Sequence, residues 1–208
     1  MSKEEDGNEV RSGKKVILID NRDSFTFNLA ESFTRLGCSV RTYRNSANAS
    51  AILDEAIAEN ALIALSPGPG GPEDAGCCQE VVHLAAGKVP VIGICLGHQV
   101  LVHVAGGEVK RAQLAVHGSA SEMEHDGQGP FKDLQSPVRV ARYHSLCSRD
   151  VPVGFTVHAE LEGMAMAISD DGKLQVGLQF HPESILTPEG DAILQNVLTM
   201  TFKDRSSS

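Results

Sequence analysis

The sequence has 208 residues, a formal net charge of -9 at pH 7 and a hydrophobic content of 41%. This length suffices for one sizeable α/β core, so we expect a single domain over residues 14–204 with disordered polar tails at 1–13 and 205–208. The negative charge argues against nucleic acid and anionic membranes as partners. No apolar run has the length of a membrane span and the N-terminus is too polar for a signal peptide, so we expect a cytoplasmic protein.

The first half of the chain alternates strand-like apolar runs with helix-like segments. The predicted strands are Lys15–Ile19, Ser39–Tyr43, Leu62–Leu65 and Val91–Ile94. The predicted helices are approximately Ser24–Leu36, Ala49–Asn60, Gln79–Gly87 and Leu96–Ala105. The first helix has a core-facing stripe at helical spacing, formed by Phe25, Leu29, Phe33 and Leu36. Such alternation predicts a parallel sheet covered by helices.

The segment 109–179 has a different sequence pattern, in which short β-like runs replace the alternation of strands and helices. Asp126-Gly127 and Asp171-Gly172 are hairpin-type turn signals, which predict antiparallel strands at the far side of the sheet. Thr187-Pro188-Glu189 then predicts the N-cap and first turn of a closing helix, whose inward face is Ile193, Leu194, Val197 and Leu198. We therefore expect an α/β fold with a mixed, mostly parallel open sheet, flanked by helices and carrying an antiparallel extension.

The first motif in chain order is the loop Ser66–Pro72, which follows the third predicted strand. Its glycines expose backbone and its prolines stiffen it, so it could direct amide N–H groups at a substrate carbonyl. A phosphate-binding loop would end in Gly-Lys-Ser/Thr and would need the N–H donors that proline lacks, so we reject nucleotide binding. A rigid surface turn stays open for this loop by itself.

Gly93-Ile94-Cys95-Leu96-Gly97 lies between the fourth strand and the helix that follows it. A sharp strand-to-helix turn strains its central residue, and small residues two positions to either side avoid a clash. The helix N-terminus stabilises negative charge, which favours an accessible Cys95 thiolate, and the Leu96 N–H would point toward a developing oxyanion. The motif predicts a cysteine nucleophile; the alternative is a buried cysteine in a tight turn.

His181 and Glu183 lie in Phe180–Ser184, directly after a strand-like run. A cysteine nucleophile needs an imidazole to take and return a proton, and the imidazole needs a carboxylate to fix its tautomer. Alternate spacing puts both side chains on one side of an extended chain, so Glu183 could reach the ring while His181 faces Cys95. By itself the pair would more often be a loop histidine beside a solvated glutamate.

Together these motifs resemble the class I, or triad, glutamine amidotransferases, over roughly residues 15–203. The branch that serves anthranilate and aminodeoxychorismate synthases is the most similar, on the segments Asp20–Leu29, Ser66–Pro72, Gly93–Gln99, His117-Gly118, Arg142–Leu146 and Phe180–Ile185. Within the branch the glutaminase subunits of bacterial anthranilate synthases look closest, on Tyr43–Asn45, Glu124–Gln128 and Val140–Leu146. The resemblance implies a flavodoxin-like class I glutamine amidotransferase fold.

The family's site residues can be assigned to matching positions of this sequence. The resemblance implies that Cys95 is the nucleophile, His181 the general acid–base and Glu183 the carboxylate that orients it, in agreement with the reading of the residues themselves. It also implies a glutamine site made by Gly68, Pro69, Gly70, Leu96, Gln99, Ser145 and Leu146. From chemistry alone, Gln99 would be an ordinary helix residue and Ser145 a loop hydroxyl bonded to nearby backbone.

The resemblance implies glutamine hydrolysis through a thioester on Cys95, with ammonia passed to a large chorismate-binding synthase subunit, anthranilate synthase component I. It places the required Mg2+ in that partner and no cofactor in this chain. The sequence departs from the pattern at Ser119, where most relatives have lysine, and at Ala105, where an aromatic residue is usual. These departures lie outside the triad and concern how the chain contacts its partner.

Three other functions stay open. The same glutaminase could serve aminodeoxychorismate synthase in folate synthesis, which only partner preference can distinguish. A stand-alone γ-glutamyl hydrolase or cysteine protease would be fully active without a partner. A catalytically silent scaffold subunit would not be labelled on Cys95 by a diazo-ketone glutamine analogue.

The remaining cysteines and the histidines give no sign of a disulfide framework or a metal site. The five cysteines have neither framework spacing nor CxxC pairs, which fits a reducing compartment. The eight histidines form no HExxH or Cys/His ligand cluster. We therefore expect no metal in this chain.

Overall fold

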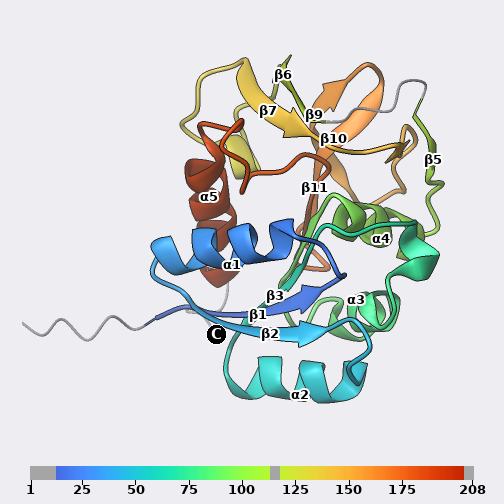
Figure 1. Cartoon of the computed structure of the whole chain (residues 1–208), viewed down its shortest axis with the longest axis vertical. Coiled ribbons are helices and arrows are strands. Elements are labelled where there is room, and N and C mark those ends of the chain that lie inside the picture. The colour runs from blue at the N-terminus through green and yellow to red at the C-terminus, as the bar shows by residue number, and fades with distance from the viewer. Residues whose placement is uncertain (1–12, 113–117, 204–208) are drawn as a thin grey trace, which may run out of the picture.

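The computed structural model describes residues 13–112 and 118–203. His117 and nearly all of the two predicted tails lie outside the described residues. A seven-stranded sheet runs through the molecule in the order β2-β1-β3-β4-β11-β10-β9 (Figure 1).

Five neighbouring strands of this sheet are parallel, and two antiparallel strands extend it at one edge. The parallel strands are β1 (Lys15–Asp20), β2 (Ser39–Arg44), β3 (Leu62–Leu65), β4 (Val91–Ile94) and β11 (Gln175–Leu178). The extension consists of β10 (Met164–Asp170) and β9 (Thr156–Leu161). The predicted mixed, mostly parallel sheet is therefore confirmed. Its last parallel strand, β11, comes from the far end of the chain and pairs with β4, so the two strands end side by side.

Helices cover both faces of the sheet because alternate strand residues point to opposite sides. Val16 and Leu18 of β1 belong to a hydrophobic cluster with α1 (Phe25–Arg35) and α5 (Gly190–Lys203). Ile17 and Ile19 belong to a second cluster, with α2 (Ala49–Ala58), α3 (Cys78–Ala85) and α4 (Leu96–Val104). Figure 1 shows α1 and α2 on opposite sides of β1 and β2.

Two small antiparallel sheets complete the region beyond β4 and β11. In one, β6 (Ser119–Met123) pairs with β7 (Val138–Arg142); in the other, β5 (Lys110–Arg111) pairs with β8 (Leu146–Cys147). Short 3₁₀ helices, η1 (Pro72–Asp74) and η2 (Gly129–Phe131), lie in the connections. Because β7 and β8 are both paired, they hold the segment 143–145 between them in a fixed place.

The two turn signals had different outcomes. Asp171-Gly172 joins β10 to β11, so that hairpin is confirmed. Asp126-Gly127 does not join two strands directly, because residues 124–137 separate β6 from β7. The Asp126 Oδ1 atom instead accepts a hydrogen bond of 2.8 Å from the Gln128 N–H, a local side-chain turn within a long connection.

The closing helix begins later than the sequence predicts. Its inward face is buried as expected, at Ile193, Leu194, Val197 and Leu198. The predicted N-cap at Thr187 is wrong, because α5 starts at Gly190 after a turn in which the Gly190 N–H donates to the Thr187 carbonyl. The Thr187 hydroxyl is used elsewhere: it donates to the His181 carbonyl oxygen at 2.7 Å and accepts from the Ala141 N–H at 2.9 Å.

Candidate active site

Cys95 occupies the sharp turn between β4 and α4 that its flanking glycines predict. Its backbone has φ 53° and ψ -99°, a strained conformation for a residue with a side chain. The Cys95 N–H donates to the Leu178 carbonyl of β11 at 2.8 Å, and the Cys95 carbonyl accepts from the Gln99 N–H. The turn is therefore attached to the sheet on one side and to the first turn of α4 on the other.

The two glycines permit a close approach of three backbone segments. A Cβ atom on Gly97 would lie 2.6 Å from the Leu65 carbonyl oxygen at the end of β3. A Cβ atom on Gly93 would overlap the carbonyl group of Gly97. Both are backbone clashes that no side-chain rotation relieves, so this turn requires glycine at both positions.

His181 and Glu183 form a buried pair beside the Cys95 turn. The His181 Nδ1 atom lies 2.7 Å from Glu183 Oε1, and both side chains are almost completely shielded from solvent. The His181 N–H donates to the Ala141 carbonyl at 3.0 Å, which fixes the backbone of this segment against β7. The other ring nitrogen, Nε2, is buried and makes no hydrogen bond. An imidazole with one ring nitrogen anchored and the other free has the arrangement that a general acid–base needs.

Burial lowers the pKa of His181, but Cys95 and Glu183 more than compensate for this effect. The nearby Cys95 sulfur, the hydrogen bond to Glu183 and attraction to the negative charges of both groups together raise the pKa of His181 to about 10. The protonated imidazole is therefore favoured whenever the two neighbours are ionised.

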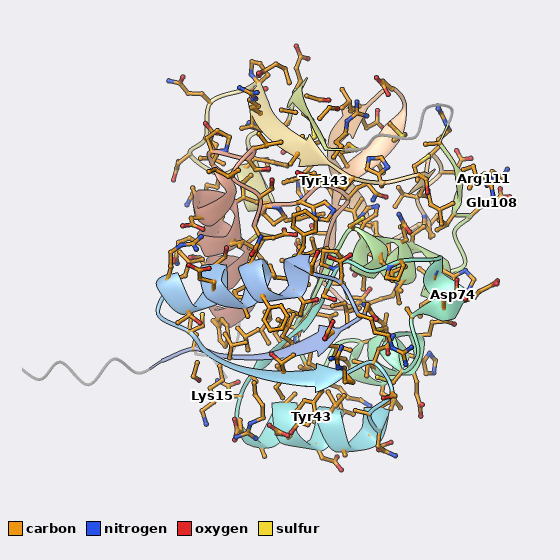
Figure 2. The ribbon with its side chains drawn as sticks, viewed as in Figure 1. Lys15, Tyr43, Asp74, Glu108, Arg111 and Tyr143 are labelled. Carbon is orange, nitrogen blue, oxygen red and sulfur yellow. The ribbon has the colours of Figure 1, made fainter. Side chains whose placement is uncertain are left out.

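Two aromatic rings enclose the His181 imidazole. Phe25, at the start of α1, has its ring centroid 5.1 Å from that of His181. Tyr143 lies 5.0 Å away in an edge-to-face arrangement, and its own ring contacts Phe25 at 4.9 Å. Figure 2 shows Tyr143 in the region above α1. These rings exclude water from one side of the imidazole and restrict its rotation.

The loop after β3 is fixed by Asn21, which follows β1. The Asn21 N–H donates to Ser66 Oγ at 2.9 Å and the Asn21 Nδ2 donates to the Ser66 carbonyl at 2.9 Å. Asn45 Nδ2 and the Cys78 thiol in turn donate to Asn21 Oδ1. A Cβ atom on Gly68 would lie 2.5 Å from the Asn21 Cβ and 2.7 Å from the Leu96 Cδ2, so the loop packs directly onto both residues.

A cavity of about 150 Å³ lies between this loop and the Cys95 turn. Six of the seven predicted glutamine-site residues line it together with Cys95: Gly68, Pro69, Gly70, Gln99, Ser145 and Leu146. The seventh, Leu96, has a buried side chain and is the first residue of α4. Its backbone N–H belongs to the first turn of that helix, where amides have no partner within the helix. The structure thus brings the predicted residues together, although they come from three separate segments of the chain.

The structure adds three residues to the site that the sequence did not predict. Tyr143 and His144 line the cavity, and the buried Gln179 side chain contacts both Cys95 and Gln99. Gln179 could have been found from the sequence, because it precedes His181 by two positions and therefore points to the same side of an extended chain. His144 carried no such signal.

His144 differs from His181 in its electrostatics. Its Nδ1 atom lies 3.0 Å from the Leu146 carbonyl oxygen, and its Nε2 atom is buried without a hydrogen bond. The pKa of His144 is lowered to about 4, mainly by burial; the hydrogen bond to the Leu146 carbonyl opposes this shift, and the positive charges of Arg142 and His181 add to it. The site therefore contains one imidazole that favours the neutral form and one that binds a proton strongly, and only the second has the electrostatics that acid–base chemistry needs.

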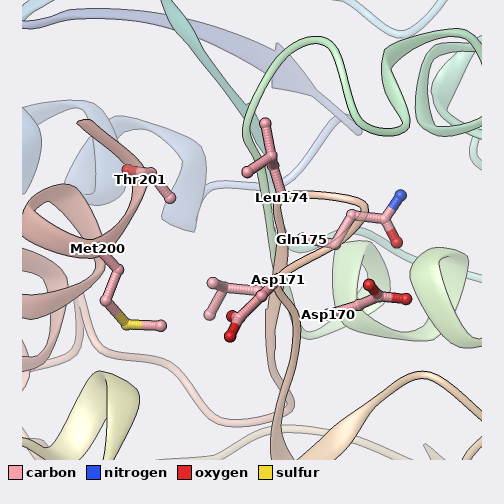
Figure 3. Close-up of a pocket in the computed structure, with 7 residues that line it drawn as sticks. Asp170, Asp171, Leu174, Gln175, Met200 and Thr201 are labelled. Atoms are coloured by element: carbon pink, nitrogen blue, oxygen red, sulfur yellow. The ribbon is translucent and has the colours of Figure 1, made fainter. Parts of the chain in front are cut away.

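A second cavity of about 250 Å³ lies at the opposite end of β11, beside the C-terminal turns of α5 (Figure 3). Its lining includes Asp170, Asp171, Gln175 and Met200. The Asp170 carboxylate is already paired with the Lys173 ammonium at 3.1 Å. Its lining contains no cysteine or histidine, in contrast to the cavity beside Cys95.

Across residues 13–112 and 118–203, no group of three or more His, Cys, Asp and Glu side chains has the arrangement of a metal site. Within the same part of the chain, no helix is long and apolar enough to span a membrane.

The positions at which the sequence departs from the family pattern lie away from this cavity. Ser119 is exposed at the start of β6, where it pairs with Arg142 in the neighbouring strand. Ala105 is the half-buried residue that ends α4. Neither contacts the Cys95 turn in the structure.

Comparison with known proteins finds relatives of this chain both by sequence and by fold. A family model described as glutamine amidotransferase class-I matches residues 17–200. The anthranilate synthase component 2, pyocyanine specific, of Pseudomonas aeruginosa is 46% identical over 185 residues, which cover 88% of this chain and 92% of the relative. The anthranilate synthase component 2 of Vibrio parahaemolyticus is 45% identical, covering 92% of this chain and 98% of the relative.

Solved structures agree on the fold. A protein from Thermoplasma acidophilum matches with a TM-score of 0.82 at 21% identity, covering 93% of this chain and 96% of its own. A glutamine amidotransferase from Thermotoga maritima matches with a TM-score of 0.73 at 18% identity, covering 91% and 99%. With the family model spanning most of its length and relatives at this level of identity, the chain belongs to the class-I glutamine amidotransferase family.

Proposed function

We propose that this chain is the glutamine-hydrolysing subunit of an anthranilate synthase, with Cys95 as its nucleophile. The observation that carries the chemistry is the buried contact between His181 and Glu183 beside a cysteine held in a strained turn at the edge of a cavity. The choice of pathway rests on relatives at 44–46% identity that are named anthranilate synthase component 2.

The reaction begins with transfer of the Cys95 thiol proton to His181 and attack of the thiolate on the side-chain amide carbon of glutamine. The oxyanion that forms is stabilised by the Leu96 N–H and by backbone N–H groups of the loop containing Gly68 and Gly70. Pro69 contributes rigidity but no N–H donor.

The protonated His181 then donates its proton to the departing nitrogen, and ammonia leaves while a glutamyl thioester remains on Cys95. The same imidazole, now neutral, takes a proton from water as the water oxygen attacks the thioester. Glutamate leaves, and the sulfur recovers its proton from His181. Glu183 keeps the ring oriented through Nδ1 and stabilises the cationic form in both halves of the reaction.

The ammonia would pass to a large subunit that binds chorismate and Mg2+ and makes anthranilate. This partner, the location of Mg2+ in it and the cytoplasmic setting are parts of the same proposal. The names of the relatives, which are second components of anthranilate synthases, support the partner.

The test mixes this chain with a purified anthranilate synthase large subunit, chorismate, Mg2+ and either glutamine or ammonium salt. We expect glutamine-dependent anthranilate formation to require both chains. Cys95→Ser should abolish the reaction with glutamine and leave the reaction with ammonia intact, whereas Cys38→Ala, at a buried cysteine outside the site, should retain both. Equal loss of both reactions in Cys95→Ser would contradict the division of labour. Glutamine hydrolysis without anthranilate formation would favour the alternative, in which the same glutaminase serves aminodeoxychorismate synthase.

A further inference from the structure

Gln179 is a fully buried amide that lies between the Cys95 sulfur and the glutamine cavity. Its Nε2 atom is 3.7 Å from Cys95 Sγ, within hydrogen-bond distance for sulfur. Its Oε1 atom is 3.2 Å from Gln99 Nε2. Its backbone N–H donates to the Met166 carbonyl across the neighbouring strand, so the backbone of Gln179 is held independently of its side chain.

The direction of the Gln179 amide follows from one backbone carbonyl. The Leu146 carbonyl oxygen can only accept, and the Gln99 amide donates to it at 3.1 Å. The atom of Gln99 at that position is therefore nitrogen, and the atom of Gln179 that faces the same nitrogen is therefore oxygen. The opposite end of the Gln179 amide, which faces Cys95, must then be the NH2 group. This series of contacts therefore directs the NH2 group of Gln179 at the Cys95 sulfur.

A buried amide is costly unless both of its ends are paired. The side-chain partners of Gln179 in the structure are Cys95 and Gln99. An apolar side chain would fill the same space against the sheet without any need for partners. The presence of an amide at 0% exposure thus points to its contact with the sulfur.

A hydrogen bond to sulfur is stronger when the sulfur is charged than when it is protonated or acylated. A donor at this position stabilises the thiolate that attacks glutamine and the same thiolate when it leaves the thioester. His181 cannot fill this role while it is giving its proton to the departing nitrogen or taking one from water.

We propose that Gln179 is a catalytic residue that donates a hydrogen bond to the Cys95 thiolate and is held in that direction by Gln99. The proposal rests on Cys95 being the nucleophile, as proposed above. Because Gln99 also lines the glutamine cavity, the same contact joins the nucleophile to the substrate pocket.

The test measures how fast iodoacetamide alkylates Cys95 between pH 5 and pH 10, followed by mass spectrometry on the whole chain. Gln179→Met keeps the length of the side chain and removes the donor, and Gln179→Glu keeps the shape and replaces the donor by a charge. The matched control is Gln195→Met, at an exposed position of α5 where the side-chain amide donates to the Thr199 hydroxyl one turn away.

We expect the pH midpoint of alkylation to rise by about one to two units in Gln179→Met, which is the tenfold to hundredfold change expected on losing a hydrogen bond to a charged group. The midpoint should rise further in Gln179→Glu and stay unchanged in Gln195→Met. Folded Gln179 variants with the wild-type midpoint would overturn the proposal, even if their stability or their KM for glutamine had changed.

A second measurement needs no substitution at Gln179. The side-chain amide signals of Gln179 in the ¹⁵N–¹H spectrum of the wild-type chain should move as Cys95 titrates and when Cys95 is alkylated. Signals that stay in place through both changes would also overturn the proposal. Neither measurement uses glutamine turnover, so failure of the proposed function would appear separately, as alkylation that behaves as expected without any glutaminase activity.

Discussion

The Nδ1 atom of His181 lies 2.7 Å from the Oε1 atom of Glu183, and the two residues are separated by a single proline. Because the sequence interval is short and both side chains are buried, the Glu183 carboxylate and the His181 imidazole have little freedom to move apart. It leaves the buried Nε2 atom without a hydrogen bond, which is the end of the ring that the proposed reaction uses.

Replacing Glu183 by glutamine should reduce glutamine hydrolysis by on the order of 10²–10⁴-fold, because the neutral amide no longer stabilises the imidazolium or fixes its tautomer. The change should appear mainly in kcat, measured as ammonia released from saturating glutamine in the presence of the synthase subunit. The matched control is Glu160→Gln, which makes the same chemical change at an exposed position of β9. Equal loss in both variants would contradict the assignment.

The same substitution has a predicted pH signature. The pKa of His181 is raised from the ordinary 6.5 to about 10, and Glu183 is one of its causes. For a base whose pKa rises on folding, the stabilising effect is fully present below pH 6.5 and is lost as the pH rises through about 10. Glu183→Gln should therefore move the loss of stability to lower pH. Urea unfolding of both forms between pH 6 and pH 10 measures this; parallel curves would contradict it.

Asn21→Ala should destabilise the fold by about 1–3 kcal/mol, because it leaves the buried Ser66 carbonyl without its side-chain donor. The loop that carries Gly68 and Gly70 would keep the backbone hydrogen bonds of Ser66 but lose its side-chain attachment to Asn21, so KM for glutamine should rise more than kcat falls. Urea denaturation and steady-state kinetics measure the two effects. Asn28→Ala, at an exposed position of α1, is the matched control for stability. A normal KM together with reduced stability would mean that Asn21 supports the fold alone.

Much of the fold follows from hydrophobic periodicity. The strand Val91–Ile94 was predicted with its observed bounds, and α1 and α4 differ from their predicted ends by one residue at most. The error at Thr187 has a physical cause: the pattern of threonine, proline and glutamate matches a helix start, but its hydroxyl bridges the Ala141 N–H and the His181 carbonyl instead. A tertiary hydrogen bond thus overrode a local signal.

The residues of the site likewise fall into those that a local sequence pattern predicts and those that it does not. The turn at Cys95 and the pair of His181 and Glu183 have local signatures, because each role requires particular residues at fixed short spacing. Tyr143 and His144 enter the cavity only because β7 and β8 hold the intervening segment beside α4. No short-range pattern encodes that pairing, so the sequence could not reveal it.

Gly97→Ala should destabilise the chain by about 1–3 kcal/mol and lower the reactivity of Cys95, because the added methyl group would lie 2.6 Å from the Leu65 carbonyl oxygen. Relief requires the start of α4 to move away from β3, which displaces the Leu96 N–H from the cavity. Gly71→Ala is the matched control, since a Cβ there would meet its nearest neighbour at 3.6 Å and its φ of -119° suits any residue. Thermal unfolding and alkylation of Cys95 measure the two effects, and equal behaviour of both variants would contradict the steric argument.

Thr187→Val should separate the role of the Thr187 hydroxyl from that of its methyl group. Valine keeps the shape of the side chain, but it leaves the buried Ala141 N–H without the Thr187 acceptor. The His181 carbonyl loses the shorter of its two hydrogen bonds and keeps the one from the Ser184 N–H at 3.3 Å. We expect a loss of about 1–3 kcal/mol in stability and a lower kcat, because the backbone that carries His181 is no longer attached to the segment before α5. Thr187→Ser retains the hydroxyl and should recover most of both, apart from the packing of one methyl group. A serine variant as impaired as the valine variant would show that packing at Thr187, and not its hydrogen bonds, positions His181.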